Sequence, residues 1–128
     1  MRVRSVLYML TVLYLLVGYN GLKTVTFEQL YNKDLNKVSK IEIRSGSTGE
    51  LKSITDKTII NKFLVKVKNV KLIPDKDQRE MKGYKYRVTL YDSESQTFEF
   101  TSTEFNGHYY QPDHDILKVI KTIFNETL

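Results

Sequence analysis

The two histidines are the residues best suited to hold a metal ion or to move a proton. His114 stands between Asp113 and Asp115, and His108 precedes a pair of tyrosines. Zinc and copper sites take several such ligands at a defined spacing. Three consecutive side chains diverge on a helix, so the two aspartates are better explained as residues that cap a helix N-terminus. A weak zinc or copper site shared with His108 is the alternative interpretation.

A second group of oxygen ligands, Asp75, Asp77 and Glu80, lies in the polar segment 75–83. An EF-hand calcium loop needs more ligands, and it needs a glycine at its sixth position, where this segment has Glu80. We therefore interpret the segment as a solvated loop. No serine lies in a nucleophile-elbow motif, and no glycine-rich loop has the phosphate-binding pattern. The lack of cysteine excludes thiolate metal sites and thiol nucleophiles. The sequence thus predicts no catalytic residue, no metal and no cofactor.

Tyrosine is the most unusual part of the composition, with nine residues and no tryptophan. Tyrosines on strands are often simply part of a packed sheet. They are also frequent on recognition surfaces, because the side chain is large, fairly rigid and able to form hydrogen bonds. Our candidates for partner binding are tyrosines on predicted strands and the basic residues between them: Tyr84, Lys85, Tyr86, Arg87, Tyr91, Tyr109 and Tyr110. Glu99 joins these candidates if one face of the sheet is free of helices.

The N-terminal segment predicts where the protein acts. Arg2 and Arg4 precede the uncharged apolar run Ser5–Tyr19, which is typical of a signal peptide. As a helix this run spans about 22 Å, against a hydrocarbon core of about 30 Å. Small residues of a cleavage motif are poorly placed. We expect residues 1–21 to be a signal peptide, with an uncleaved membrane anchor or a buried core helix as alternatives. Either of the first two places the folded domain outside the cytoplasm.

The net charge of +5 includes the two arginines of the N-terminal segment. The remainder has 18 basic and 15 acidic side chains, which are spread along the chain. Nucleic-acid binding requires a dense basic stripe, which the sequence does not contain. A mildly positive surface suits contact with anionic lipid headgroups or wall polymers, or it reflects ordinary solvated lysines. We therefore predict no nucleic-acid partner, and membrane contact only through residues 1–21.

Residues 22–128 are predicted to form a single α+β domain. Alternating apolar and polar residues predict strands at 40–44 and 84–90, each followed by a turn and a returning strand. Asn106-Gly107 predicts the turn of a further hairpin. Consecutive strands joined by tight turns form antiparallel pairs.

Two amphipathic helices are predicted from apolar residues at helical spacing. One covers Ile59–Val67 after a cap at Thr55–Asp56, and the other starts at Pro112–Asp113. A short helix of about two turns is also expected after Thr26. The predicted architecture is a single antiparallel sheet of about five strands, with the two amphipathic helices packed on one face.

Four stretches of the domain resemble a known class of small proteins. They are Lys40–Ile43, the return Gly49–Asp56 into a helix, and Gly83–Tyr86 before a strand at Phe98–Phe100. In pattern and composition they resemble the small secreted or lipoprotein-type domains of unknown function from Bacillus-like Firmicutes. The resemblance implies export in a Gram-positive bacterium, and it includes no catalytic motif. This chain departs from the lipoprotein members because it has no lipid-acceptor cysteine.

Together, the sequence predicts a non-catalytic binding or interaction domain that is secreted or tethered at the cell surface. Its partner would be an envelope protein, a peptide or an anionic wall polymer. An aromatic, sparsely charged sheet face would favour this function, and a polar face with scattered charges would count against it. Two alternatives stay open: an inhibitor or immunity-type protein that blocks one partner through segment 75–83, and an enzyme with an unrecognised carboxylate-based site. The sequence leaves the specific partner and the oligomeric state open.

Overall fold

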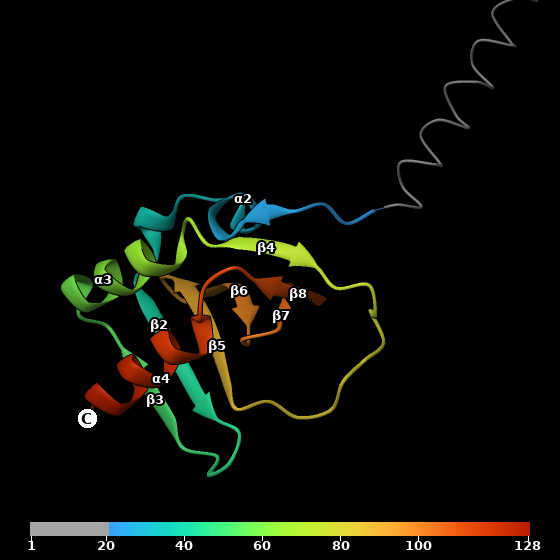
Figure 1. The fold of residues 1–128 in the computed structure, drawn as a ribbon. Coiled ribbons are helices and arrows are strands. Elements are labelled where there is room, and N and C mark those ends of the chain that lie inside the picture. Colours follow the sequence, from blue (N-terminus) through green and yellow to red (C-terminus); the bar gives the residue numbers. More distant parts are fainter. Residues whose placement is uncertain (1–20) are drawn as a thin grey trace, which may run out of the picture.

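The computed structural model describes residues 21–128 of the chain (Figure 1). The predicted targeting segment, residues 1–21, lies outside the described residues except for Gly21. Within residues 21–128, no helix is both long enough and apolar enough to cross a membrane.

In the described part of the chain, eight strands form one antiparallel sheet in the spatial order β1, β4, β8, β7, β6, β5, β2, β3. Tight connections join β2 to β3, β5 to β6 and β7 to β8, whereas β2 meets β5, and β4 meets β8, from distant parts of the chain. The strands have the following bounds: β1 Val25–Thr26, β2 Lys40–Ser45, β3 Leu51–Ile54, β4 Lys71–Pro74, β5 Tyr86–Asp92, β6 Ser95–Phe100, β7 Glu104–Phe105 and β8 His108–Pro112.

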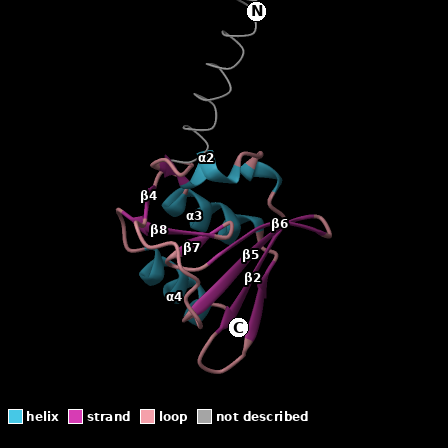
Figure 2. Ribbon diagram, turned by 90° about the vertical axis from the view of Figure 1, so that its right-hand side faces the viewer, coloured by secondary structure: helices cyan, strands magenta, loops and turns pink. Residues whose placement is uncertain are grey.

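Within residues 21–128, three α-helices and one 3₁₀ helix accompany the sheet. Figure 1 shows α3 and α4 next to each other, with α4 close to β5 and α2 beside β1. Figure 2 shows the same helices against the strands after a quarter turn. The helices have the following bounds: α2 Phe27–Tyr31, the 3₁₀ helix η1 Leu35–Lys37, α3 Lys57–Val67 and α4 Ile116–Glu126.

Each α-helix begins at a polar residue that binds the free backbone N–H groups of the first turn. The Thr26 side chain accepts a hydrogen bond from the backbone N–H of Gln29, whose own side chain accepts one from Thr26, which makes a capping box. Asp56 caps α3, and Asp115 caps α4. A local side chain therefore caps the first turn of each of these helices.

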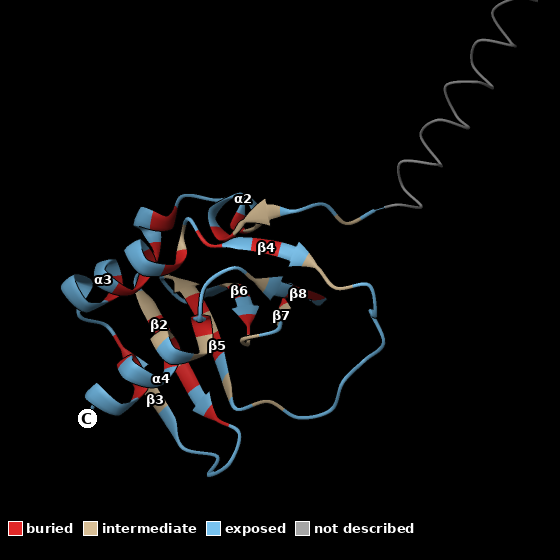
Figure 3. Cartoon of the chain, in the orientation of Figure 1, coloured by how far each residue is buried: buried red, intermediate tan, exposed pale blue. Residues whose placement is uncertain are grey.

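The core lies between the helices and the apolar face of the sheet, where buried residues alternate along the strands (Figure 3). Phe27, at the start of α2, is fully buried. Its ring meets those of Phe98, Phe100 and Phe105 edge-on, at centroid distances of 5.4, 5.0 and 6.4 Å. Edge-to-face pairs add to the gain from apolar burial, so the short helix α2 is held by aromatic packing.

The predicted sheet of about five strands with two helices on one face is wrong, because residues 21–128 form eight strands and three α-helices. β1 and β7 contain two residues each, too few for the alternation that identifies a strand in a sequence. The third helix, α2, is the short helix that the sequence predicted after Thr26; it has five residues and joins the core through Phe27 and Tyr31. Pairing with neighbouring strands creates β1 and β7.

The predicted start of the last helix at Pro112–Asp113 is also wrong. Pro112 ends β8, where it pairs with Leu72 of β4. The Asp113 carboxylate accepts a hydrogen bond from the backbone N–H of Lys71, 2.9 Å away, and Asp115 takes the capping role instead. By contrast, the predicted helix Ile59–Val67 is present within α3, and the hairpin after residues 40–44 is present as β2–β3.

Candidate functional site

Four of the predicted partner-binding residues are consecutive, and the structure places them where the chain enters β5. We call residues Tyr84–Arg87 the β5 entry segment. The side chains of Tyr84 and Tyr86 are partly exposed, and those of Lys85 and Arg87 are exposed. Tyr91 lies near the other end of the same strand and is partly exposed.

The remaining two candidates, Tyr109 and Tyr110, are buried, with exposed fractions of 6% and 3%. The Tyr109 hydroxyl accepts a hydrogen bond from the backbone N–H of Met81 at 2.8 Å. Tyr110 packs edge-on against Phe105, and burial raises the pKa of its phenol. Both rings therefore serve the packing of the domain itself.

The β5 entry segment is fixed against the turn between β2 and β3. The Gly46 backbone N–H donates a 2.7 Å hydrogen bond to the carbonyl oxygen of Lys85. A Cβ atom at Gly46 would lie 1.7 Å from the carbonyl oxygen of Tyr84, so only glycine fits this approach. The sequence predicted a turn after residues 40–44, and it gave no signal of this contact.

Arg87 organises the side of the entry segment that faces away from the helices. Its guanidinium lies over the Tyr84 ring, 4.2 Å from the centroid, and its Nε is 3.1 Å from a carboxylate oxygen of Glu99. Both side chains of the ion pair are nearly half exposed, so the pair contributes about 0–1 kcal/mol to stability. The contacts fix where the guanidinium lies more than they stabilise the fold.

Two pockets meet at Arg87. The β6–β7 pocket, of about 440 Å³, includes Arg87, Glu99, Thr101 and Glu104. The loop pocket, of about 590 Å³, shares Arg87, Thr101 and Glu104 and continues past Tyr84 to segment 78–83. Carboxylates line both pockets beside the guanidinium, so their charge is mixed.

A third pocket, of about 420 Å³, lies on the opposite side of the entry segment, between the start of β5 and α4. Tyr86 is held there by the ring of Phe124, at a centroid distance of 5.1 Å. Among the described residues that line it, none carries a carboxylate side chain. We call it the β5–α4 pocket, and its lining is Gly46, Ser47, Tyr84, Lys85, Tyr86, Leu117 and Lys121.

The solvent-facing side of β2, β5 and β6 is polar and carries charges of both signs. By the antiparallel register, Lys40 is opposite Tyr91, Glu42 is opposite Thr89, and Arg44 is opposite Arg87, with Glu99 on the next strand. The Lys40 ammonium lies 4.2 Å from the centroid of the Tyr91 ring. A hydrogen bond to Glu42, with smaller effects of burial and of the charges of Glu42 and Glu99, raises the pKa of Tyr91. This polar face counts against a binding surface spread over the sheet.

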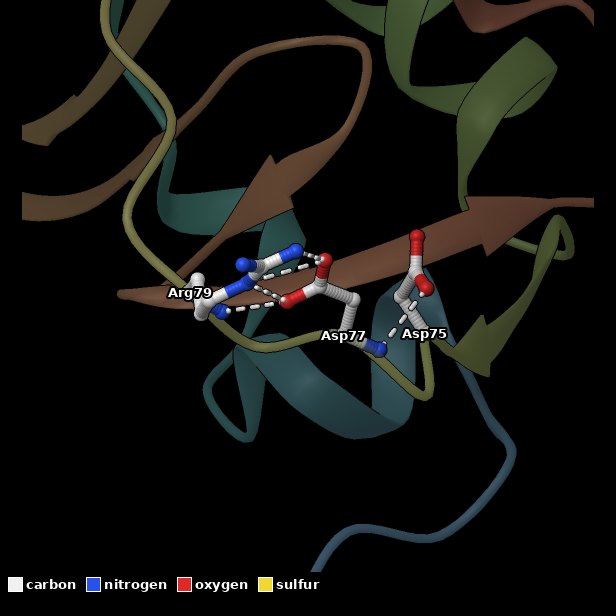
Figure 4. Close-up of polar contacts among 3 residues, drawn as sticks. All are labelled: Asp75, Asp77 and Arg79. Carbon is white, nitrogen blue, oxygen red and sulfur yellow. Dashed lines mark hydrogen bonds and ion pairs between the residues drawn. The ribbon is translucent and has the colours of Figure 1, made fainter.

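Segment 75–83 uses the side chains of Asp75 and Asp77 in its own turns (Figure 4). Asp75 accepts a hydrogen bond from the backbone N–H of Asp77 at 3.1 Å. Arg79 forms a 2.8 Å ion pair with Asp77, and this hydrogen-bonded contact lowers the pKa of the Asp77 carboxyl. The pair is exposed and bidentate, with both Arg79 Nε and Nη2 directed at the carboxylate.

Gln78 attaches this segment to β8 and was not found by sequence reasoning. Its side-chain NH₂ donates to the carbonyl oxygen of Tyr109 at 2.8 Å, and its side-chain oxygen accepts from the Tyr109 N–H at 2.9 Å. The amide therefore pairs with Tyr109 as a neighbouring strand would. A glutamine in a polar loop carries no sequence signal for such a contact.

The histidines lie apart from the β5 entry segment. His114 Nδ1 is 2.7 Å from a carboxylate oxygen of Asp113, whose pKa is lowered first by this hydrogen bond. His108 is exposed on β8. In the described part of the chain, no three His, Asp or Glu side chains gather in a way that could hold a metal ion.

The β5 entry segment therefore combines two aromatic rings, a lysine, an arginine and the pockets that surround them. Such groups bind ligands through ring contacts and through charge-assisted hydrogen bonds. In comparisons with known proteins, no family model, no curated protein and no solved structure matches the chain.

Proposed function

We propose that the chain is a non-catalytic binding module of the cell envelope, exported or tethered through residues 1–21, which binds its partner at the β5 entry segment. One observation carries this proposal: Tyr84–Arg87 lie on the surface at the meeting point of three pockets. Binding sites are usually concave and combine apolar walls with a few polar groups that fix the orientation of a ligand.

The partner is an envelope component with anionic groups, either a wall polymer or an acidic protein or peptide segment. Lys85 and Arg87 are exposed, and Lys121 of α4 lines the adjacent pocket. A lysine presents a compact charge, whereas an arginine presents a planar fork that suits carboxylate and phosphate groups. The polar outer sheet face plays no part in this proposal.

The test has two readouts, made with a tagged full chain in a Gram-positive host. Cell fractionation, with a mass measurement of the mature N-terminus, reports location and cleavage. Retention on purified envelope then compares the wild type with the double variant Lys85→Ala/Arg87→Ala. The matched control is Lys62→Ala/Lys66→Ala, which removes the same number of charges from α3, outside the three pockets.

We expect an envelope location and about a tenfold loss of retention for the entry-segment variant, with little change for the α3 control. An intact chain dissolved in the cytosol would contradict the location. Equal losses for the two double variants would contradict the site, because they would mean that only overall charge matters.

An inhibitor of one protein partner is the second candidate function, favoured by the position of segment 75–83. Figure 1 shows this connection between β4 and β5 extending from the body of the domain, and Gln78 fixes one part of it to β8. An inhibitor would lose its partner in the variant Arg79→Ala and keep it in Lys85→Ala/Arg87→Ala. The binding module would show the reverse.

A further inference from the structure

The β5–α4 pocket differs from the two pockets at Arg87 in the charge of its lining. Its lining includes the two cationic residues Lys85 and Lys121, and none of its described lining residues is Asp or Glu. The pockets at Arg87 include Glu99 and Glu104. Cations without an acidic neighbour in the lining attract anions beside low-dielectric walls, so the charge of this lining favours a negatively charged ligand.

The walls of this pocket are largely apolar rings and chains. Tyr84 and Tyr86 line it from the strand side, and Leu117 lines it from α4. Leu117 and Lys121 are four residues apart on α4, so they present an apolar group and a cation on one face of the helix. A ligand that fits both features has a ring-shaped body and an anionic group.

The pocket is held in shape without a ligand. The Gly46–Lys85 hydrogen bond of 2.7 Å fixes the backbone, the Phe124 ring holds Tyr86, and Arg87 covers the Tyr84 ring. Within residues 21–128, neither the Lys85 nor the Lys121 ammonium takes part in an ion pair. Both cations are therefore available to a ligand, and a preformed site avoids the cost of ordering side chains on binding.

We propose that the β5–α4 pocket binds a phosphorylated sugar, with the ring against Tyr84 and Tyr86 and the phosphate between Lys85 and Lys121. The volume of about 420 Å³ is in the range of small-molecule sites. The proposal rests on the function proposed above and names the class of its ligand. The sugar phosphate is either free or a unit of a phosphate-linked polymer, and the chemistry at the pocket is the same.

The experiment is an NMR titration of the ¹⁵N-labelled full chain in a mild non-ionic detergent. The probes are glucose 6-phosphate and a phosphodiester-linked glucose oligomer, with glucose and inorganic phosphate as separate controls. The test variant is Lys121→Glu, and the matched control is Lys118→Glu, which makes the same charge change on α4 outside the pocket.

We expect saturable shifts at the amides of Gly46, Lys85 and Lys121, and weaker responses to glucose or phosphate alone. Lys121→Glu weakens binding of glucose 6-phosphate about tenfold, and Lys118→Glu changes it by less than about twofold. A polymer source is indicated if the oligomer binds at least about tenfold more tightly than the monomer, because neighbouring units raise the effective concentration. Comparable affinities indicate a free sugar phosphate.

The inference is overturned if neither probe gives saturable shifts up to about 10 mM, which is the limit of weak specific binding. It is also overturned if the shifts map to the pockets at Arg87, or if Lys118→Glu and Lys121→Glu weaken binding equally. Envelope retention that depends on Lys85 and Arg87, without sugar phosphate binding, refutes this inference and leaves the proposed function standing.

Discussion

The substitution Gly46→Ala tests the contact that holds the β5 entry segment in place. An added Cβ would lie 1.7 Å from the Tyr84 carbonyl oxygen and 2.8 Å from its carbonyl carbon. Ordinary van der Waals contact begins at 3.4 Å, so the carbonyl oxygen would have to retreat by about 1.7 Å. Its neighbour, the Lys85 carbonyl, accepts the 2.7 Å hydrogen bond from Gly46, and the two peptide groups are consecutive. The movement would therefore break this bond.

The expected cost combines two effects. Loss of the hydrogen bond costs about 1 kcal/mol, and forcing a methyl group into a packed contact costs about 1–3 kcal/mol. Alanine also restricts the unfolded chain, which offsets about 0.4–1 kcal/mol. We therefore expect Gly46→Ala to lower the free energy of unfolding by about 2 kcal/mol, within a range of about 1–4 kcal/mol.

Urea unfolding of the full chain, followed by circular dichroism, measures this change. The control is Gly49→Ala, where φ is +76° and no atom lies within 4 Å of the added Cβ. Backbone strain alone predicts a loss of about 1 kcal/mol there. The reasoning is refuted if Gly46→Ala destabilises the chain no more than Gly49→Ala does. It is supported further if the Tyr84 and Lys85 amide signals move only in Gly46→Ala.

Three further outcomes follow from the described contacts. Tyr109→Phe removes the acceptor for the Met81 N–H, so we expect a loss of about 1 kcal/mol and faster hydrogen exchange at that amide; unchanged exchange would contradict the bond. Phe27→Ala empties the centre of the aromatic cluster and should cost about 3–5 kcal/mol in urea unfolding, whereas a loss below about 1 kcal/mol would exclude that packing. The pKa of Asp113 is lowered by its hydrogen bond to His114, so its stabilising effect is complete above the unfolded-state pKa and is lost as the pH falls through the lower folded value. When the pH is lowered below 3.8, the ordinary pKa of an aspartate, the free energy of unfolding should therefore fall less in Asp113→Asn than in the wild type. Parallel plots of unfolding free energy against pH for the two proteins would contradict this.

Helix α3 could be predicted from the sequence because its local pattern and its packing agree. Ile60, Phe63, Leu64 and Val67 recur at helical spacing, and all four are buried. The cap at Asp56 was equally readable, since its carboxylate binds N–H groups two and three residues later. In such a segment, tertiary packing stabilises a helix that the local sequence already favours.

The start of α4 could not be predicted, because two residues fit the local rule equally well. Asp113 and Asp115 both stand before the apolar stripe of the helix. The Lys71 N–H on β4 binds the Asp113 carboxylate, and this contact between residues 42 positions apart decides between them. The small strands β1 and β7 have the same origin, since each exists through pairing with a partner strand.

The candidate site was predictable only in the part that lies on one strand. Alternation identified Tyr84 and Tyr86 together with the basic residues Lys85 and Arg87. Leu117 and Lys121 belong to the same pocket only because α4 packs beside the start of β5. These α4 residues are far from the entry segment in the chain, so no local pattern indicates the contact, and sequence reasoning missed the α4 side of the pocket.

The site lies where regular strand pairing ends, and this position explains its exposure. β2 pairs with β5 as far as Ser45 and Tyr86, and beyond that point only the Gly46 N–H reaches the Lys85 carbonyl. Tyr84 and Lys85 therefore leave the ladder, and their side chains are no longer confined to a core face or a solvent face of the sheet. Tyr84 can then border pockets on both sides of the chain, which no residue inside a paired strand could do. Binding residues at the ends of rigid elements combine a fixed position with access to ligand, and the β5 entry segment meets both conditions.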